Sequence, residues 1–304
     1  MKAIYLLIVA FVFSVSGFAQ NSIDLFSVSG GYGWPSSYEA PYSEKATEVQ
    51  QHVAATIPIE LSDKTIFFNN FNYYHFSLES NNEFGDAIAN PADLHGFILR
   101  TGIVRKLNDK NKFQLFFIPR YMSDFNKSSE TAWQFGGVAM FEHRYNKDLM
   151  MRYGLMYNAE FFGHYFIPVV HLDWNITEKV SVAGMLPIYM KIKYKYSDRL
   201  ELGFSHLGLT TSYRLGGETY DGDYLVRQSI DLALYGRYHL GKNFHLETKV
   251  GMALGRQYDQ FANDQKVDLS LPLVNIGDDR LIKSTPFDNG PFINLKLVYN
   301  YPLD

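Results

Sequence analysis

The chain of 304 residues contains no cysteine. Disulfide bonds and a lipid anchor on cysteine are therefore excluded. Beyond the N-terminal segment there is no apolar run of about 18 residues, so the sequence predicts no transmembrane helix. Charge of neither sign dominates, since the formal net charge is −4 and the pI is about 6.1. No basic surface for nucleic acid is therefore expected.

Sequence motifs of common hydrolases are also absent. The chain contains no G-x-S-x-G element and no H-E-x-x-H element, which are signatures of serine hydrolases and zinc metalloproteases. The acidic residues of segment 258–290 lack the D-x-D-x-D-G spacing of a calcium loop. We therefore expect no enzyme activity and assign no catalytic residue, no metal ligand and no cofactor.

The N-terminus has the features of a secretory signal peptide. Lys2 is followed by the uncharged run AIYLLIVAFVFSV, and small residues stand at Gly17 and Ala19. This run is shorter than the about 20 residues that a membrane-spanning helix needs. We therefore expect residues 1–19 to be a signal peptide cleaved after Ala19. Residues 20–304 would then form one domain outside the cytoplasm.

Aromatic residues and glycine are abundant, with 24 Phe, 22 Tyr and 23 Gly. The stretch NFHLETKVGMALG (243–255) alternates strictly, with Phe244 and Leu246 on one face and His245 and Glu247 on the other. A period of two predicts a β-strand. In a soluble protein the apolar face would pack on a core, whereas in an outer-membrane barrel it would contact lipid and the polar face would line the lumen.

The lengths of the connections between strands favour the membrane barrel. Three polar residues separate two alternating segments at 62–64, 146–148, 177–179, 197–199 and 241–243. Longer, irregular segments lie between these turns, at 34–46, 80–92, 124–131, 216–223 and 258–290. Short turns alternating with long loops are typical of outer-membrane barrels, which place the turns in the periplasm and the loops outside.

The predicted fold class is all-β, a transmembrane antiparallel up-and-down barrel of about 14 strands. The weakest boundary lies in VAGMLPIYMKIKY, which we divide at Pro187 because a central proline interrupts a ladder. Without that division the count falls to 12. The predicted strands are 22–33, 47–61, 65–79, 94–107, 112–124, 132–145, 149–160, 166–176, 180–186, 188–196, 200–214, 225–240, 244–257 and 291–302.

The short turns also predict how neighbouring strands align. If the residues flanking each turn pair with one another, three hairpins each place opposite charges across from one another on the polar face, and such pairs stabilise a sheet. The three pairs are Arg237 with Glu247, Glu142 with Arg152, and Lys195 with Glu201. The polar face is therefore expected to be the interior of the barrel.

Short motifs in the second half of the chain are similar to those of a known family. The ending FAQ of the signal, the element GMLPIYMK leading into YKYSDRLELGF, and YRL at 213–215 carry the resemblance. The chain resembles an uncharacterised outer-membrane barrel family of Bacteroidota, a domain of unknown function, most clearly over residues 165–300. The resemblance implies a membrane β-barrel and no active-site residues.

A partly basic lumen is expected from the inward-facing charges. It could act as a selectivity wall for anionic solutes, or the charges could form a closed network that fills the barrel. The expected lumen-lining residues are Arg100, Arg120, Glu142, Arg152, Asp173, Lys191, Lys193, Lys195, Glu201, Asp231, Arg237, Glu247 and Lys249.

The main functional hypothesis is a pore or transporter for small solutes in the cell outer membrane, with membrane lipid and small solutes as its partners. The alternative is a non-conducting barrel whose external loops bind a partner. A third hypothesis is a membrane-embedded hydrolase, for which His171 and Asp173 could form a dyad because they alternate onto one strand face. The radius of the lumen distinguishes the first two hypotheses.

Overall fold

The computed structural model describes residues 22–302, apart from 86, 127–131, 218, 221 and 287. The expected signal peptide, residues 1–19, lies outside the described residues. Within the described ranges, no helix has the length and apolar character needed to cross a membrane. All strands belong to one sheet.

The strands follow one another along the chain with the following bounds. They are β1 Ser22–Ser37, β2 Lys45–Ser62, β3 Thr65–Ser80, β4 Ala92–Lys106, β5 Asn111–Ser123, β6 Trp133–Arg144, β7 Leu149–Glu160, β8 Gly163–Asn175, β9 Val180–Leu186, β10 Tyr189–Lys195, β11 Leu200–Arg214, β12 Tyr224–Gly241, β13 Phe244–Phe261, β14 Leu269–Leu271, β15 Val274–Ile276 and β16 Gly290–Pro302.

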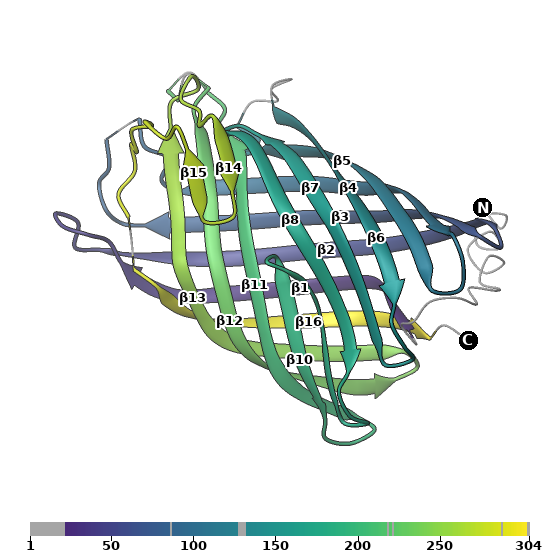
Figure 1. Ribbon diagram of the computed structural model, residues 1–304. Helices are drawn as coiled ribbons and strands as arrows, with labels where there is room; N and C mark the ends of the chain where they lie inside the picture. Colours follow the sequence, from purple (N-terminus) through teal and green to yellow (C-terminus); the bar gives the residue numbers. More distant parts are fainter. Residues whose placement is uncertain are drawn as a thin grey trace, which may run out of the picture.

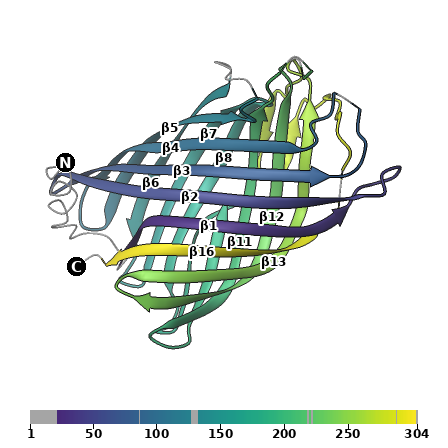
Figure 2. The ribbon, with the colours of Figure 1, turned by 180° about the vertical axis from the view of Figure 1, so that it is seen from behind.

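The sheet closes into a barrel. Each of β1 to β13 pairs antiparallel with its sequence neighbour, β13 pairs with β16, and β16 pairs with β1. The short β14 and β15 form a hairpin that is attached to β8 by one parallel pairing, of Ser270 with Tyr165, and is not part of the closed wall, which therefore has fourteen strands. Figures 1 and 2 show the two sides of this barrel, with β14 and β15 lying in front of the wall in Figure 1.

The two ends of the barrel differ in their connections. At one end lie the three-residue turns and the paired residues Ser22 and Pro302, where the first strand begins and the last strand ends. We call this the turn end. At the other end lie the long segments, including 262–289, and we call it the loop end. The loop end also contains two turns of two residues, at 161–162 and 187–188. The expected sorting is therefore confirmed for the long segments, which all lie at the loop end, but not for every short turn. The turn end is the one expected in the periplasm.

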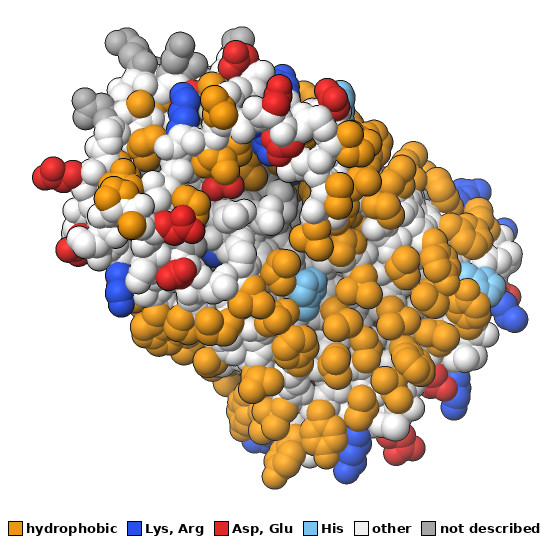
Figure 3. Space-filling view, turned by 60° about the vertical axis from the view of Figure 1, so that its left-hand side comes forward, with side chains coloured by type: hydrophobic (Ala, Val, Ile, Leu, Met, Phe, Trp, Pro, Cys, Tyr) orange, Lys and Arg blue, Asp and Glu red, His pale blue; other side chains and the backbone are white. Residues whose placement is uncertain are grey.

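The outer surface of the wall is apolar. Large hydrophobic side chains such as Leu234, Leu155 and Leu295 are exposed at alternate positions along the strands. Figure 3 shows hydrophobic side chains spread over the wall, with charged side chains gathered toward its ends. This pattern is that of a barrel surrounded by lipid.

The predicted strands are confirmed, including the division at Pro187, since β9 ends at Leu186 and β10 begins at Tyr189. Two features of the loop end were not predicted. β13 continues to Phe261, and the β14–β15 hairpin lies inside the segment 258–290 that was expected to be a loop.

The three predicted strand registers are also confirmed. Arg237 pairs with Glu247, Glu142 with Arg152, and Lys195 with Glu201. The residues next to the GKN turn pair differently from the prediction. An irregularity between His239 and Gly241 makes Gly241 the partner of Phe244. The expected pairing of Leu240 with Phe244 is therefore wrong, although the charged residues still face one another.

Candidate functional site

Contacts across the barrel identify which side chains point inward. Arg227 on β12 and Glu48 on β2 form an ion pair with a distance of 3.1 Å between Nη2 and Oε1, although three strands of the wall separate β12 from β2. Such a contact must cross the interior. Side chains alternate along a strand. The pairing registers therefore identify the inward-facing side chains on each of the remaining strands.

The interior is filled at the loop end. The largest buried apolar cluster joins side chains from opposite walls, including Leu94 on β4, Met122 on β5, Tyr213 on β11 and Leu225 on β12. Each of these side chains is almost completely buried. A side chain on Gly96 of β4 would meet Met122 and Tyr213, so the two walls contact each other here. No open passage runs through this packed region.

A buried polar network lies beside the apolar cluster. The carboxylate of Glu48, which is 0% exposed, accepts hydrogen bonds from Arg227 and from the Tyr258 hydroxyl. The Arg256 guanidinium lies 3.9 Å from the same carboxylate. Arg227 also stacks on the Phe76 ring, with its guanidinium carbon 3.9 Å from the ring centroid. We call the apolar cluster together with this network the loop-end plug.

A second buried ion pair stands on the opposite wall. Arg120 on β5 donates a hydrogen bond of 2.8 Å to Glu160 on β7. The other oxygen of Glu160 accepts a bond of 2.7 Å from the Ser212 hydroxyl on β11. The side-chain amide of Gln134 on β6 donates to the same hydroxyl, at 3.0 Å. These bonds join the β5–β7 wall to β11.

Contacts between strand ends and loops close the opening of the barrel at the loop end, which we call the mouth. β5 and β11 lie far apart around the wall, yet Ser123 and Arg214 at their ends pair in parallel. The Asp124 carboxylate accepts a hydrogen bond of 2.9 Å from the Gly216 amide. Gln260 on β13 holds segment 81–91 across the mouth, because its side chain bonds to the backbone of residues 87 and 89. The mouth is therefore covered.

The interior of the turn-end half is polar and basic. Lys191 on β10 forms an ion pair of 2.7 Å with Glu247 on β13. Lys249 lies 3.6 Å from the same carboxylate, and Lys296 on β16 is its direct cross-strand neighbour. We call these four residues the lysine cluster. Three ammonium groups share one carboxylate, so the lysine cluster carries a formal charge of +2.

Solvent reaches the interior at mid-height. Tyr189 pairs with the inward-facing Met185, and its ring contacts that of His171 inside the barrel. Leu207 pairs with both Tyr189 and the inward-facing Asp231. Tyr189 and Leu207 therefore point inward, yet each is 39% exposed. Solvent therefore reaches the interior at the height of these two residues.

Several expected lumen residues belong to ion pairs inside the barrel. Arg120, Lys191, Glu247 and Lys249 belong to the pairs described above. Glu142 accepts a hydrogen bond of 2.7 Å from Arg152 and lies 3.5 Å from Lys112. This pair is the one predicted from the NKD turn.

Other expected lumen residues have different partners from those predicted. Arg237 faces Glu247 across the strands, but its ion pair of 3.1 Å is with Asp24 on β1. Lys195 faces Glu201, but it forms its ion pair with Asp198 in the SDR turn. The register was therefore predicted correctly in both cases, while the interaction was not.

The remaining expected lumen residues lie along the same inward faces. Arg100 lies over the rings of Phe68 and Phe116 at 5.1 and 5.3 Å. Asp231 accepts a hydrogen bond of 2.5 Å from Ser229. Lys193 alternates with Lys191 on β10, and Asp173 alternates with His171 on β8. The His171 Nε2 atom is buried without a hydrogen-bond partner, so this atom forms no dyad with Asp173.

A cavity of about 390 Å³ lies outside the wall at the loop end. Gln228 and Gln257 contribute to its lining, and each alternates with an inward residue of its strand, so the cavity is on the outer face of β12 and β13. Segment 269–282 covers the cavity, and we call it the flap. Its exposed tip carries Leu273, which is 82% exposed.

An ion pair holds the flap in shape. The Arg280 guanidinium donates two hydrogen bonds of 2.8 Å to Asp278. These bonds lower the pKa of the Asp278 carboxyl below its ordinary value. The stabilisation that the pair provides is therefore complete above the ordinary carboxyl pKa, and it is lost as the pH falls through the lowered one.

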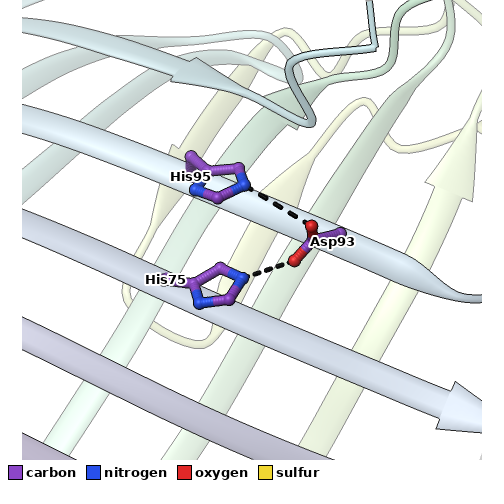
Figure 4. Close-up of side chains that lie close together, drawn as sticks. All are labelled: His75, Asp93 and His95. Atoms are coloured by element: carbon purple, nitrogen blue, oxygen red, sulfur yellow. Dashed lines mark hydrogen bonds and ion pairs between the residues drawn. The ribbon is translucent and has the colours of Figure 1, made fainter.

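A cluster of two histidines and an aspartate at the loop end was not predicted from the sequence. Figure 4 shows His75 on β3 and His95 on β4 with Asp93 between them. The two strands are joined by the long segment 81–91, so no short turn indicated their register. The only signal was the alternation D-x-H at 93–95, which places both side chains on one face.

Comparisons with known proteins support assignment to a family. No curated protein matches the chain. A solved structure with a similar fold is the COG4313 outer membrane channel from Pseudomonas putida F1, 9% identical over 95% of this chain and 100% of that chain, with a TM-score of 0.46. The TodX monoaromatic hydrocarbon channel, as a deltaS2 mutant, is 9% identical over 92% and 90%, with a TM-score of 0.39.

The family comparison covers most of the sequence. The family described as "Domain of unknown function (DUF6268)" matches residues 15–266. The predicted resemblance to an uncharacterised family is thus confirmed. The match extends further toward the N-terminus than the motifs indicated, and it ends at residue 266 rather than near 300. An origin in Bacteroidota stays an expectation. Because the match spans well over half of the sequence, the chain belongs to the DUF6268 family of unknown function.

Proposed function

We propose that this protein is a channel of the cell outer membrane for small anionic solutes, and that the structure describes its closed state. The lysine cluster is the observation that supports this proposal. Three lysines from β10, β13 and β16 converge on one carboxylate in a part of the interior that solvent reaches. An excess of positive charge within low-dielectric walls raises the local concentration of anions and disfavours cations in a pore.

The apolar outer surface supports placement in a membrane. Exposed hydrophobic side chains on the outward face would be unfavourable in water, whereas lipid solvates them. The aromatic residues Tyr145, Trp174, Tyr196 and Tyr238 are exposed near the turn end, where a girdle at the membrane interface would lie. The expected signal peptide would direct the chain to this location.

The way in which the mouth is closed supports gating. Gln260 holds segment 81–91 through side-chain hydrogen bonds, and Asp124 holds Gly216 in the same way. The first set of bonds joins a wall strand to a loop and the second joins two loops, and none of them pairs neighbouring strands of the wall, so they can break while the barrel stays intact. Loops with few wall contacts open at lower free energy than the strands do.

Planar-bilayer recordings test the proposed selectivity. The protein should show rare openings, and the reversal potential in a KCl gradient should have the sign of an anion-selective pore. Changing Lys191, Lys249 and Lys296 to Gln removes three of the positive charges around Glu247, so selectivity should shift toward cations. The matched control is Lys242→Gln in the exposed GKN turn, which should leave the reversal potential unchanged.

A second variant tests the gate. Gln260→Ala removes the side chain that holds segment 81–91, so the open fraction should rise without a change in selectivity. Gln257→Ala, on the outer face of the same strand, should have no such effect. If neither the natural protein nor Gln260→Ala conducts, or if openings are cation-selective, the proposal is wrong.

The alternative is a non-conducting barrel whose loop-end segments bind a partner, and the flap is the observation that favours it. Leu273, Leu281 and Ile282 are exposed on the flap and form an apolar surface beside the cavity. This alternative predicts no channel openings from any variant, together with loss of partner binding when residues 269–282 are replaced by a short polar loop. Openings that depend on Gln260 would contradict it.

A further inference from the structure

His75, Asp93 and His95 stand together on the outward face of the barrel near its loop end. His75 and His95 are direct cross-strand partners on β3 and β4, and Asp93 alternates onto the same face as His95. Their neighbours Phe76 and Leu94 are buried in the interior, which shows that the cluster points outward. Figure 4 shows both imidazole rings directed at the carboxylate.

The cluster is accessible to water at the rim. The Asp93 side chain is 55% exposed. Toward the turn end, the same face carries aromatic rings, with Tyr73 and Phe97 in contact at 4.8 Å between centroids. Rings of this kind mark the interface of a membrane barrel, so the cluster lies on the water side of it. The His75 and His95 side chains are 19% and 17% exposed, so solvent reaches all three side chains, Asp93 most readily.

The three side chains offer suitable ligand atoms at suitable separations. The His75 Nε2 atom forms a hydrogen bond with one Asp93 oxygen, and the His95 Nε2 atom lies 3.6 Å from the other. One ligand atom from each residue lies within 4.8 Å of the other two. Ligands of a tetrahedral zinc ion with bonds of about 2.0–2.1 Å lie about 3.3 Å apart. Small side-chain rotations would bring the three atoms to these positions.

We propose that His75, Asp93 and His95 bind one zinc ion, with water in the remaining position. Two imidazole nitrogens and a carboxylate oxygen are ligands that zinc prefers, whereas calcium and magnesium prefer oxygen ligands alone. The bound ion would replace the proton that now lies between His75 and Asp93. The negative charge of Asp93 would offset part of the charge of the ion.

Neighbouring groups hold the ligands in orientation. The Tyr73 hydroxyl is 2.8 Å from the His95 Nδ1 atom. When His95 Nδ1–H donates to this oxygen, the Nε2 lone pair is directed at Asp93. Such a bond on the second ring nitrogen is the usual way in which a protein fixes a metal-binding imidazole. The Phe125 ring stacks on His95 at 4.7 Å between centroids and limits its rotation.

Zinc binding can be measured on the purified, folded barrel in detergent, without a histidine tag, by competition with a chromophoric chelator. One zinc ion per chain is expected. His75→Ala and His95→Ala should each weaken binding at least tenfold, because two protein ligands hold zinc far less well than three. Asp93→Asn should weaken it in the same direction, since an amide oxygen is a poorer ligand than a carboxylate.

A second histidine pair provides the matched control. His239 and His245 are also cross-strand partners, with ring centroids 4.7 Å apart, at the turn end. His239→Ala and His245→Ala should leave zinc binding unchanged. Gel electrophoresis of unheated and heated samples verifies that each variant is folded, because a folded barrel migrates differently before and after heating. Absence of one-to-one binding, or binding that survives both His75→Ala and His95→Ala, would show that the cluster is only a hydrogen-bonded group. Binding unaffected by Asp93→Asn would overturn the three-ligand site.

Discussion

Replacing Glu48 by Gln tests whether the loop-end plug is dry. Glu48 has no exposed surface, and its carboxylate lies 3.1 and 3.3 Å from the Arg227 Nη2 atom. The Arg256 guanidinium lies 3.9 Å from the same carboxylate. Glutamine has almost the same shape, so the change creates no cavity. What it removes is the negative charge between two buried guanidinium groups.

The expected loss of stability follows from the burial of this network. Removing one partner of a buried ion pair costs about 3–5 kcal/mol, because the other charge is left in the interior without compensation. For an exposed pair the corresponding cost is about 0–1 kcal/mol, since water solvates the charge that remains. The Arg237–Asp24 pair is a suitable comparison, because its Asp24 side chain is 39% exposed.

The assay is equilibrium unfolding in denaturant of the barrel reconstituted in lipid. Glu48→Gln should shift the unfolding midpoint strongly toward lower denaturant, and Asp24→Asn should shift it little. Added salt should not reduce the difference, because a buried pair is screened weakly. Equal shifts for the two variants would show that water fills the loop end, and the description of a packed plug would then be wrong.

Other predictions concern topology, backbone packing and the flap. A cysteine at Lys242 should resist an impermeant thiol reagent in intact cells and one at Asn263 should react, while the opposite pattern would reverse the orientation. Gly102→Ala should hinder folding, because the added carbon would press on the backbone of β5, whereas Gly30→Ala has free space and should be neutral. Asp278→Asn should speed trypsin cleavage after the arginine two residues later, since that guanidinium loses its charged partner and keeps only the Tyr224 hydroxyl and the Phe261 ring.

The strand order and the registers were predictable because of the short turns. A three-residue turn leaves few ways to pair its flanking strands. Pairing around the NKD turn therefore placed Glu142 opposite Arg152, and the ion pair between them is present. Alternation then assigned both residues to the interior. The same reasoning could not choose between partners for Arg237, because Asp24 belongs to a strand far away in sequence.

The loop end was not predictable for two physical reasons. Inward side chains such as Leu94 and Tyr213 are apolar there, so these strands lose the alternation that distinguishes lumen from lipid. Long segments separate the strands at this end, so register is not determined locally. The pairing of His75 with His95 and the contact of β5 with β11 follow from the closure of the whole barrel, which short patterns do not encode.

The composition of the interior argues for function rather than for stability. A barrel that served only as a scaffold would gain most from apolar filling, since buried ion pairs are often less stabilising than hydrophobic side chains of similar volume. The β5–β6 wall shows that this chain can provide such filling, with Phe116, Ile118 and Val138. The opposite wall instead carries the lysine cluster, in which three ammonium groups repel one another around a single carboxylate. Their mutual repulsion opposes the folded arrangement, and an anion bound beside them would relieve it.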